Sequence, residues 1–338
     1  MLSIYTDISF VNETYRRQLF PLLFDICILK DSRLSAFYRL VNTPEEADVF
    51  VFPINYQAFT VHKKAYHNFT KIIEAHNKPT WVYTSGDFGY TIKEDYYNFR
   101  LGGFKSKLKD KTFVLPSFVN DPYDKLIQDF IPLQKGEQPK VGFVGHAKAG
   151  FKKYLKEFSI YVKTQIKQVL KPSKNDKQAF YPSGFKRATY LNKLIDSKLI
   201  ITNFILRNQY RAGVKTEADK IKTTQEFYEN MNQNPYTFCI RGAGNFSVRF
   251  YETLAMGRIP VLINTDCKLP LDNSINWNNH ACIIEEKDIN NMDALLTDFH
   301  SKFSNESFEV FQKNNRELWL NKLQRVSYFK QINKQFIA

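Results

Sequence analysis

Short apolar runs alternate with amphipathic stretches through the first part of the chain. Runs of this length with an apolar middle are typical of strands buried in a parallel sheet. They predict strands at residues 2–5, 27–29, 48–53, 80–83 and 112–115. Helices are predicted between them, at residues 12–23, from the capping pattern Thr43-Pro44-Glu45-Glu46, and at 66–75. This alternation predicts a doubly wound parallel sheet.

The alternation begins again after the polar residues 134–139, which are predicted to link two domains. Strands are predicted at residues 140–144, 199–202, 236–240, 259–263 and 281–284. Helices are predicted at residues 151–170, 223–232, 247–256, 288–303 and 307–323, with a loop at 171–188. The sequence therefore predicts an α/β protein with domains at residues 1–134 and 140–306, followed by C-terminal helices at 307–338.

The net charge narrows the classes of partner. The chain has 338 residues, of which 43% are hydrophobic, and a net charge of +14. Such a charge suits nucleic acid, an anionic membrane surface or a phosphate-bearing substrate, unless the lysines only solvate the surface. No recognition helix, zinc finger or RNA-binding pattern is present, so we do not expect nucleic acid as a partner.

The cysteines and the N-terminus bear on location. The four cysteines are isolated and form no CxxC pair, which indicates reduced thiols and a cytoplasmic protein; they are Cys27, Cys239, Cys267 and Cys282. The first residues show no signal-peptide pattern, and no run approaches the ~20 apolar residues of a membrane span. Peripheral contact with the inner, anionic face of a membrane stays open.

The most informative stretch is a strand–turn–helix junction in the second half. A predicted buried strand ends at Arg241, a glycine-rich turn follows, and a helix begins near Ser247. Glycines there permit positive φ and close approach of a ligand, and a helix N-terminus favours a phosphate. The turn consists of Gly242, Ala243, Gly244 and Asn245.

Charged residues around this junction complete a candidate nucleoside-diphosphate site. Arg241 and Arg249 could contact a diphosphate. Glu252 lies one helical turn after Arg249, and its carboxylate could accept hydrogen bonds from ribose hydroxyls. The alternative is a structural turn with an exposed Arg249–Glu252 ion pair. Neither a GxGxxG fingerprint nor a GxxxxGK[ST] loop is present.

This stretch resembles the exostosin family of glycosyltransferases. The matching segments are Cys239-Ile-Arg-Gly242, Ser247-Val-Arg-Phe-Tyr-Glu252, Gly257-Arg-Ile-Pro-Val261, Leu269-Pro270 and Ile275-Asn-Trp277, with fainter matches at Pro44 to Pro53 and Phe143-Val-Gly145. The resemblance implies a GT-B architecture, in which two Rossmann-like domains face each other across a cleft. It also implies an inverting transferase that uses a nucleotide sugar, usually a UDP-sugar, held by Arg241, Ser247, Arg249 and Glu252.

Further candidate site residues lie at the carboxyl ends of predicted strands, because open α/β sheets bind ligands there. Gly145 and His146 end the first strand of the second domain, and Arg207 and Arg211 form a second cationic pair; all four are candidate donor ligands. Asp87 and Asp7 end first-domain strands and are candidates for the general base, although a turn or N-cap aspartate is the common alternative. The family often has a histidine after the aspartate, where this chain has Phe88.

The remaining expectations concern cofactors and rival functions. No Asp-x-Asp motif is present, so we expect no metal and no cofactor besides the donor. The predicted reaction moves a sugar from a UDP-sugar to a glycan or lipid-linked glycan in surface polysaccharide synthesis. The alternatives are a GDP-sugar (fucosyl-type) transferase, a retaining GT-B enzyme, a silent carbohydrate-binding relative, and a basic protein that binds membrane or nucleic acid.

Overall fold

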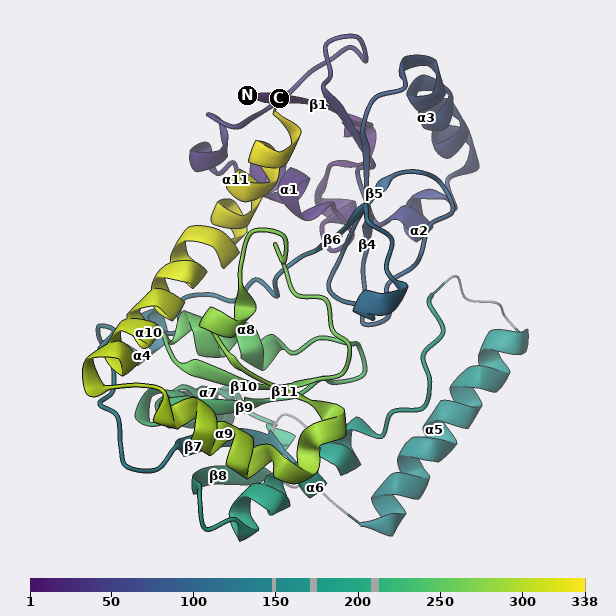
Figure 1. The fold of residues 1–338 in the computed structure, drawn as a ribbon. Coiled ribbons are helices and arrows are strands. Elements are labelled where there is room, and N and C mark those ends of the chain that lie inside the picture. Colours follow the sequence, from purple (N-terminus) through teal and green to yellow (C-terminus); the bar gives the residue numbers. More distant parts are fainter. Residues whose placement is uncertain (148–149, 171–174, 208–212, 338) are drawn as a thin grey trace.

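Two parallel β-sheets form the centres of two α/β domains (Figure 1). The structure is a computed structural model, and it describes residues 1–147, 150–170, 175–207 and 213–337. The first sheet has the order β2-β1-β3-β4-β5-β6. Its strands are β1 (Leu2–Tyr5), β2 (Tyr38–Leu40), β3 (Val49–Val51), β4 (Thr80–Thr84), β5 (Tyr97–Arg100) and β6 (Thr112–Val114).

The second sheet has the order β11-β10-β9-β7-β8, and all of its pairings are parallel. Its strands are β7 (Lys140–His146), β8 (Ile201–Arg207), β9 (Tyr236–Cys239), β10 (Ile259–Asn264) and β11 (Cys282–Glu285). The two sheets follow one another along the chain and are joined by residues 115–139.

Each sheet is covered on both faces because its strands are apolar on both faces. In β3, Val49 and Val51 belong to one hydrophobic cluster, whereas Phe50 belongs to another. Helices α2 (Tyr56–Phe59) and α3 (Lys63–His76) cover the Phe50 face, and α1 (Pro21–Leu23) and α11 (Arg325–Phe336) cover the other. The remaining helices are α4 (Tyr123–Leu126), α5 (Phe151–Leu170), α6 (Ser183–Asp196), α7 (Glu217–Gln233), α8 (Val248–Ala255), α9 (Met292–Ser301) and α10 (Asn305–Leu318).

The C-terminal helices run from the second domain to the first (Figure 1). Helix α10 continues through a π-helical turn, Trp319–Leu323, into α11. Tyr38 Oη donates to the carbonyl of Phe329 at 2.6 Å, and Asn333 donates to the carbonyl of Phe37 at 2.7 Å. These bonds attach α11 to the edge of the first sheet, so the first domain is completed by the end of the chain.

Two of the secondary-structure predictions near the N-terminus are wrong. Residues 12–23 are not one helix: Asn12 caps a short 3-10 turn, and helix α1 begins only at Pro21. Residues 27–29, which were predicted as a strand, lie within and just after the π-helical turn Phe24–Ile28. Their apolar side chains therefore pack from a helical turn and not from a strand.

Three further differences come from tertiary contacts. No helix begins at Thr43, because the ammonium of Lys78 donates to three carbonyls of the following turn, at Pro44, Glu45 and Ala47. Strands β2 and β5 carry polar residues and were not predicted. Helix α6 occupies part of the stretch predicted as a loop.

A buried aromatic on α11 gives a test of how the first domain is held together. Phe329 is fully buried and contacts the rings of Phe20 and Phe118. Phe329→Ala should lower the free energy of unfolding by about 3–5 kcal/mol, because it opens a cavity in this core. Val310→Ala on α10, where the side chain is 50% exposed, should change it by less than about 0.5 kcal/mol. Equal effects of both changes in urea unfolding would contradict this packing.

Candidate functional site

A cavity of about 930 Å³ lies between the carboxyl edges of the two sheets. Asp87, three residues past β4, lines it from the first domain. From the second domain it is lined by Gly145 and His146 at the end of β7 and by Arg207 at the end of β8. The glycine-rich turn and the start of α8 complete the wall, through Gly242, Gly244, Ser247, Arg249 and Glu252. Ligand sites of small molecules commonly have this size and place.

The glycine-rich turn is one of the places where the two domains are in close contact. A Cβ atom on Gly244 would overlap the backbone carbonyl of Asp87, whereas one on Gly242 would meet no atom within 4 Å. Neither glycine has a positive φ, so the turn does not use the backbone conformation that its glycines permit. Gly244 is instead needed for close approach of the first domain, and Gly242 leaves its side of the cavity open.

Helix α8 directs its N-terminus into the cavity. Ser247 is the N-cap residue, but its side chain makes no capping hydrogen bond. The first amide N–H groups of a helix have no partner within the helix, and they carry a partial positive charge. The hydroxyl of Ser247 and these amides can therefore bind an anion.

Arg249 is a buried cation beside this N-terminus. Its Nη2 donates to the carbonyl of Val144 at 2.8 Å, and its guanidinium stacks on Phe143 at 4.2 Å. Among the described residues it forms no ion pair, and its buried Nε has no hydrogen-bond partner. A Cβ on Gly145 would lie 2.9 Å from Nη2, so glycine makes room for the guanidinium. Burial lowers the pKa of Arg249, as expected for a charge without a counterion.

Glu252 presents a carboxylate to the same cavity one turn further along α8. Burial raises the pKa of its carboxyl, and the charges of Arg249 and Lys125 oppose the increase. The exposed Arg249–Glu252 ion pair considered from the sequence does not form. Within the described part of the chain, no hydrogen bond reaches the Glu252 carboxylate, which leaves it available to a ligand's hydroxyl groups.

Two predicted donor ligands lie behind the turn and not on the cavity wall. The side chain of Arg241 is stacked between Phe104 and Tyr181, and its Nη2 donates to the carbonyl of Ala243 at 2.7 Å. Asn245 is 1% exposed, and its amide bonds the carbonyl of Thr265 at 2.9 Å. In this structure both residues shape the turn and neither contacts the cavity.

The predicted second cationic pair is only partly described. Arg207 lines the cavity, but its Nη2 bonds the carboxylate of Glu226 at 2.9 Å. Arg211 lies outside the described residues. His146 lines the cavity, and its backbone carbonyl accepts a hydrogen bond from Arg187 at 3.2 Å.

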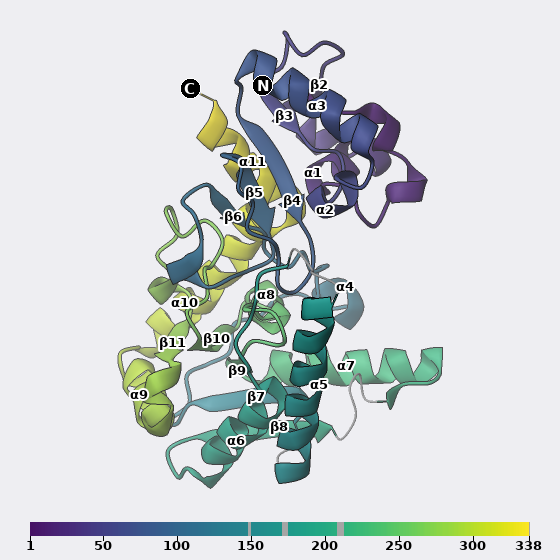
Figure 2. The same ribbon diagram turned by 90° about the vertical axis from the view of Figure 1, so that its right-hand side faces the viewer.

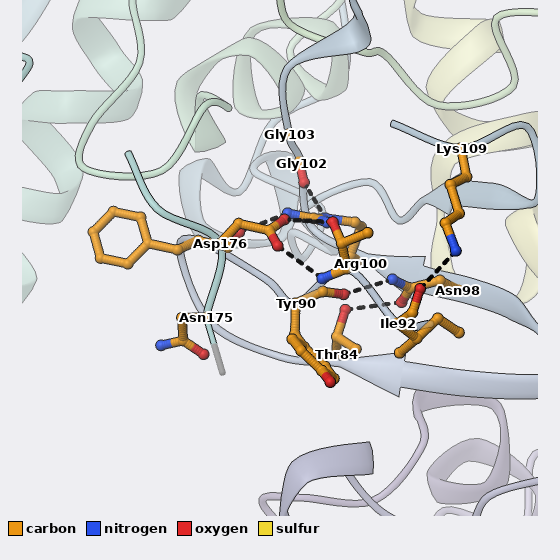
Figure 3. A network of polar contacts seen from close by, with 12 residues as sticks. Thr84, Tyr90, Ile92, Asn98, Arg100, Gly102, Gly103, Lys109, Asn175 and Asp176 are labelled. Carbon is orange, nitrogen blue, oxygen red and sulfur yellow. Dashed lines mark hydrogen bonds and ion pairs between the residues drawn. The ribbon is translucent and has the colours of Figure 1, made fainter. Parts of the chain in front are cut away.

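Asp87 is carried by a loop that Arg100 holds in place (Figure 3). The guanidinium of Arg100 is 1% exposed. It donates to the carbonyls of Phe88 at 2.5 Å and Gly102 at 2.6 Å, and to the carboxylate of Asp176 at 2.8 Å. Asp176 belongs to the segment that follows α5, so this network joins the first domain to the second.

The other candidate base lies elsewhere. Asp7 accepts hydrogen bonds from the amide and hydroxyl of Ser9 and so caps a short 3-10 turn. It lines a separate cavity of about 820 Å³ near the start of α3. The structure therefore groups Asp87 with the predicted donor residues but not Asp7.

Several cavity residues were not predicted. Arg187 reaches the cavity from α6, Phe227 from α7, and Lys156 and Glu157 from α5. Arg187 fell in the stretch predicted as a loop. Apolar residues at 188, 191 and 194 repeat with helical spacing and could have indicated the helix, although not the direction of the arginine.

In the described residues, no three His, Cys, Asp or Glu side chains gather as a metal site. All four cysteines are free. None of the described helices has both the length and the apolarity that crossing a bilayer requires.

Two parallel α/β domains with a cavity between their carboxyl edges form a GT-B architecture. Residues 147–299 match the family model of the Exostosin GT47 domain. This match bears out the resemblance to the exostosin family over that part of the chain.

The curated relatives match a shorter segment. A rice protein named probable glucuronosyltransferase GUT1 is 34% identical over 73 residues, which cover 22% of this chain and 18% of that protein. The Arabidopsis thaliana protein named probable beta-1,4-xylosyltransferase IRX10L is 34% identical over 71 residues, or 21% of this chain and 17% of the relative. The chain thus aligns with less than a fifth of these relatives.

Among solved structures, TarM superposes with a TM-score of 0.38 and 11% identity over 86% of this chain and 55% of TarM. WaaG, described as a glycosyltransferase involved in lipopolysaccharide biosynthesis, superposes with a TM-score of 0.33 and 9% identity over 94% of this chain and 82% of WaaG. TM-scores this low carry no argument about the chain.

The contact between Gly244 and Asp87 can be tested by adding one methyl group. Gly244→Ala should lower the free energy of unfolding by about 1–3 kcal/mol, because the new Cβ meets the Asp87 carbonyl. Gly242→Ala is the matched control, since its Cβ enters open space. Urea unfolding that shows the same stability for both variants would mean that the turn and the loop are further apart.

Proposed function

We propose that the protein is an inverting glycosyltransferase that binds a UDP-sugar in the cavity between its sheets. The observation that supports this most is the buried Arg249 guanidinium, which faces the cavity without an ion-pair partner among the described residues. A buried unpaired charge is costly, and a bound diphosphate would compensate it. The names of the plant relatives also point to sugar transfer.

The donor would lie along the start of α8. Its diphosphate would contact the free amides, the Ser247 hydroxyl and Arg249, and these groups would stabilise the charge that develops on the leaving diphosphate. The ribose hydroxyls would donate to Glu252. Arg187 and Arg207 add positive charge on the same wall. In this proposal the chain's own cationic groups neutralise the leaving group, and no metal is required.

Asp87 would act as the general base. It approaches the cavity from the opposite domain, as inversion requires, because the acceptor hydroxyl attacks from the side opposite to the departing diphosphate. Its side chain is exposed to the cavity, and its backbone adjoins the turn that carries Gly244. The acceptor would be a glycan or a lipid-linked glycan in surface polysaccharide synthesis.

A screen of UDP, GDP, CMP and their sugars by thermal unfolding tests the donor. UDP at 100-fold over its Kd should add about 2.7 kcal/mol of stability. Greater stabilisation by GDP would favour the GDP-sugar transferase. If no nucleotide stabilised the protein, only the non-catalytic alternatives would remain.

Glu252→Gln should weaken UDP binding about tenfold or more, because hydrogen bonds to a charged group contribute about 1.5–3 kcal/mol. Glu217→Gln on the exposed first turn of α7 is the control and should have no effect. Calorimetry with 2′-deoxy-UDP sharpens the test, because the missing hydroxyl should weaken binding to the unsubstituted protein but not to Glu252→Gln. Equal losses in both proteins would remove Glu252 from the ribose site.

Asp87→Asn should lower the rate of UDP release from the bound UDP-sugar by about 10²–10⁴-fold, since general-base catalysis contributes that much. The Kd for UDP should stay within about twofold, because UDP does not contact this side chain. Asp7→Asn should change neither quantity. If Asp7→Asn abolished turnover while Asp87→Asn did not, Asp7 and not Asp87 would be the general base.

We also propose that α5 attaches the protein to the cytoplasmic face of an anionic membrane. The helix lies at one side of the second domain (Figures 1 and 2). Leu155, Phe158, Ile166 and Leu170 are 44%, 44%, 55% and 76% exposed. Exposed lysines flank this apolar strip, at positions 152, 156, 163 and 167, and Glu157 is the only acid in the helix. A basic amphipathic helix of this kind binds at membrane interfaces.

Flotation with vesicles tests the attachment. The protein should float with vesicles that contain phosphatidylglycerol and not with pure phosphatidylcholine, and added salt should weaken the binding. Ile166→Glu should reduce flotation severalfold, whereas Ile221→Glu on α7, where the side chain is 62% exposed, should not. Failure of the protein to float with anionic vesicles would refute the proposed membrane attachment.

A further inference from the structure

A second pocket, which we call the arginine pocket, lies on the first domain. It has a volume of about 290 Å³, and its cationic wall consists of Arg16, Arg17 and Arg325. Arg16 and Arg17 come from the segment between β1 and α1, and Arg325 is the first residue of α11. Among the described residues that line the pocket there is no Asp or Glu. Three guanidinium groups around so small a space indicate an anionic ligand.

The floor of the pocket belongs to the same edge of the sheet as Asp87. Tyr83 lies near the end of β4, and Leu101 and Leu115 directly follow β5 and β6. Only three residues separate Tyr83 from Asp87: Thr84 at the end of β4 and two residues of the loop that follows. Since open α/β sheets bind ligands at the carboxyl ends of their strands, the pocket is placed for a substrate of the first domain.

Aromatic rings form the rest of the wall. The guanidinium of Arg16 lies 5.1 Å from the centre of the Phe24 ring, and that of Arg325 lies 4.9 Å from the Phe118 ring. Stacked arginines keep their planar forks directed and lose little freedom on binding. Flat apolar rings beside cationic groups suit a sugar ring that carries a charged substituent.

The charges are only partly compensated within the protein. Arg17 is exposed and has no hydrogen bond or ion pair with other described residues. Arg16 bonds Glu13 at 2.8 Å, but both side chains are exposed, so the pair contributes little. Arg325 bonds Asp25 at 3.1 Å, and burial raises the pKa of that fully buried carboxyl to about 7. The pocket therefore keeps a positive charge near neutral pH.

We infer that the arginine pocket binds the acceptor through an acidic group, a phosphate or a carboxylate attached next to a sugar ring. This inference rests on the proposed transfer reaction and specifies the class of its acceptor. A phosphate would belong to a lipid-linked acceptor and a carboxylate to a uronic acid of a growing glycan. The shared chemistry is an oxyanion between two or three guanidinium groups.

Calorimetry on the full chain tests this inference. The protein is first saturated with UDP, which fills the proposed donor cavity, and is then titrated with inorganic pyrophosphate, glucuronate or glucose. One of the two anions should bind and glucose should not; the tighter anion identifies the source. Arg17→Gln should weaken that binding about tenfold or more. Because Arg17 is exposed and unpaired among the described residues, this variant should fold normally.

Lys64→Gln is the control, because it removes one exposed positive charge from a different cavity. It should leave anion binding unchanged, and both variants should keep the wild-type Kd for UDP. The inference is overturned if neither anion binds, or if Arg17→Gln and Lys64→Gln bind the anion equally well. If UDP fails to bind while anion binding still depends on Arg17, the proposed donor is wrong but the acidic ligand stands.

Discussion

The geometry between the two domains depends on one buried guanidinium. Arg100 bonds the carbonyls of Phe88 and Gly102 and the carboxylate of Asp176, and these belong to three separate segments. A buried charge is tolerated only when its donors are satisfied, so the three segments must stay together. The Phe88 loop carries Asp87, and a Cβ on Gly102 would lie 2.8 Å from the carbonyl of Asn245. Arg100 thereby sets how closely the first domain approaches the glycine-rich turn.

Positive charge gathers around a cavity in each of the two domains. The second domain places Arg187, Arg207 and Arg249 on the wall of the cavity between the sheets. The first domain places Arg16, Arg17 and Arg325 around the smaller pocket. With a net charge of +14, such a protein attracts anionic ligands from a distance, and low-dielectric walls focus that field into the cavities. The net positive charge of the protein and the arginines that line the two cavities therefore both favour anionic ligands.

Local pattern was sufficient for most elements of the second domain. Helix α5 begins and ends where its apolar spacing predicts, and the strand–turn–helix junction at α8 follows from glycines and a serine at the N-cap position. Local pattern could not show which polar side chains face the cavity. Arg241 and Arg249 look equivalent in the sequence, but tertiary packing turns the first behind the turn and leaves the second on the wall. Asp7 and Asp87 likewise both follow strands, but Asp87 contacts the glycine-rich turn and lines the cavity between the sheets, whereas Asp7 lines a different cavity.

The path of the last helix has a consequence for synthesis on the ribosome. One face of the first sheet includes Trp81 and Phe99, and it is covered by α11, which belongs to the last part of this sequence. During vectorial synthesis at ~5–20 residues per second, that face stays uncovered until α11 has left the exit tunnel. The second domain contains its own sheet and most of its helices in one continuous stretch. The domain that is translated first is therefore the one whose folding finishes last.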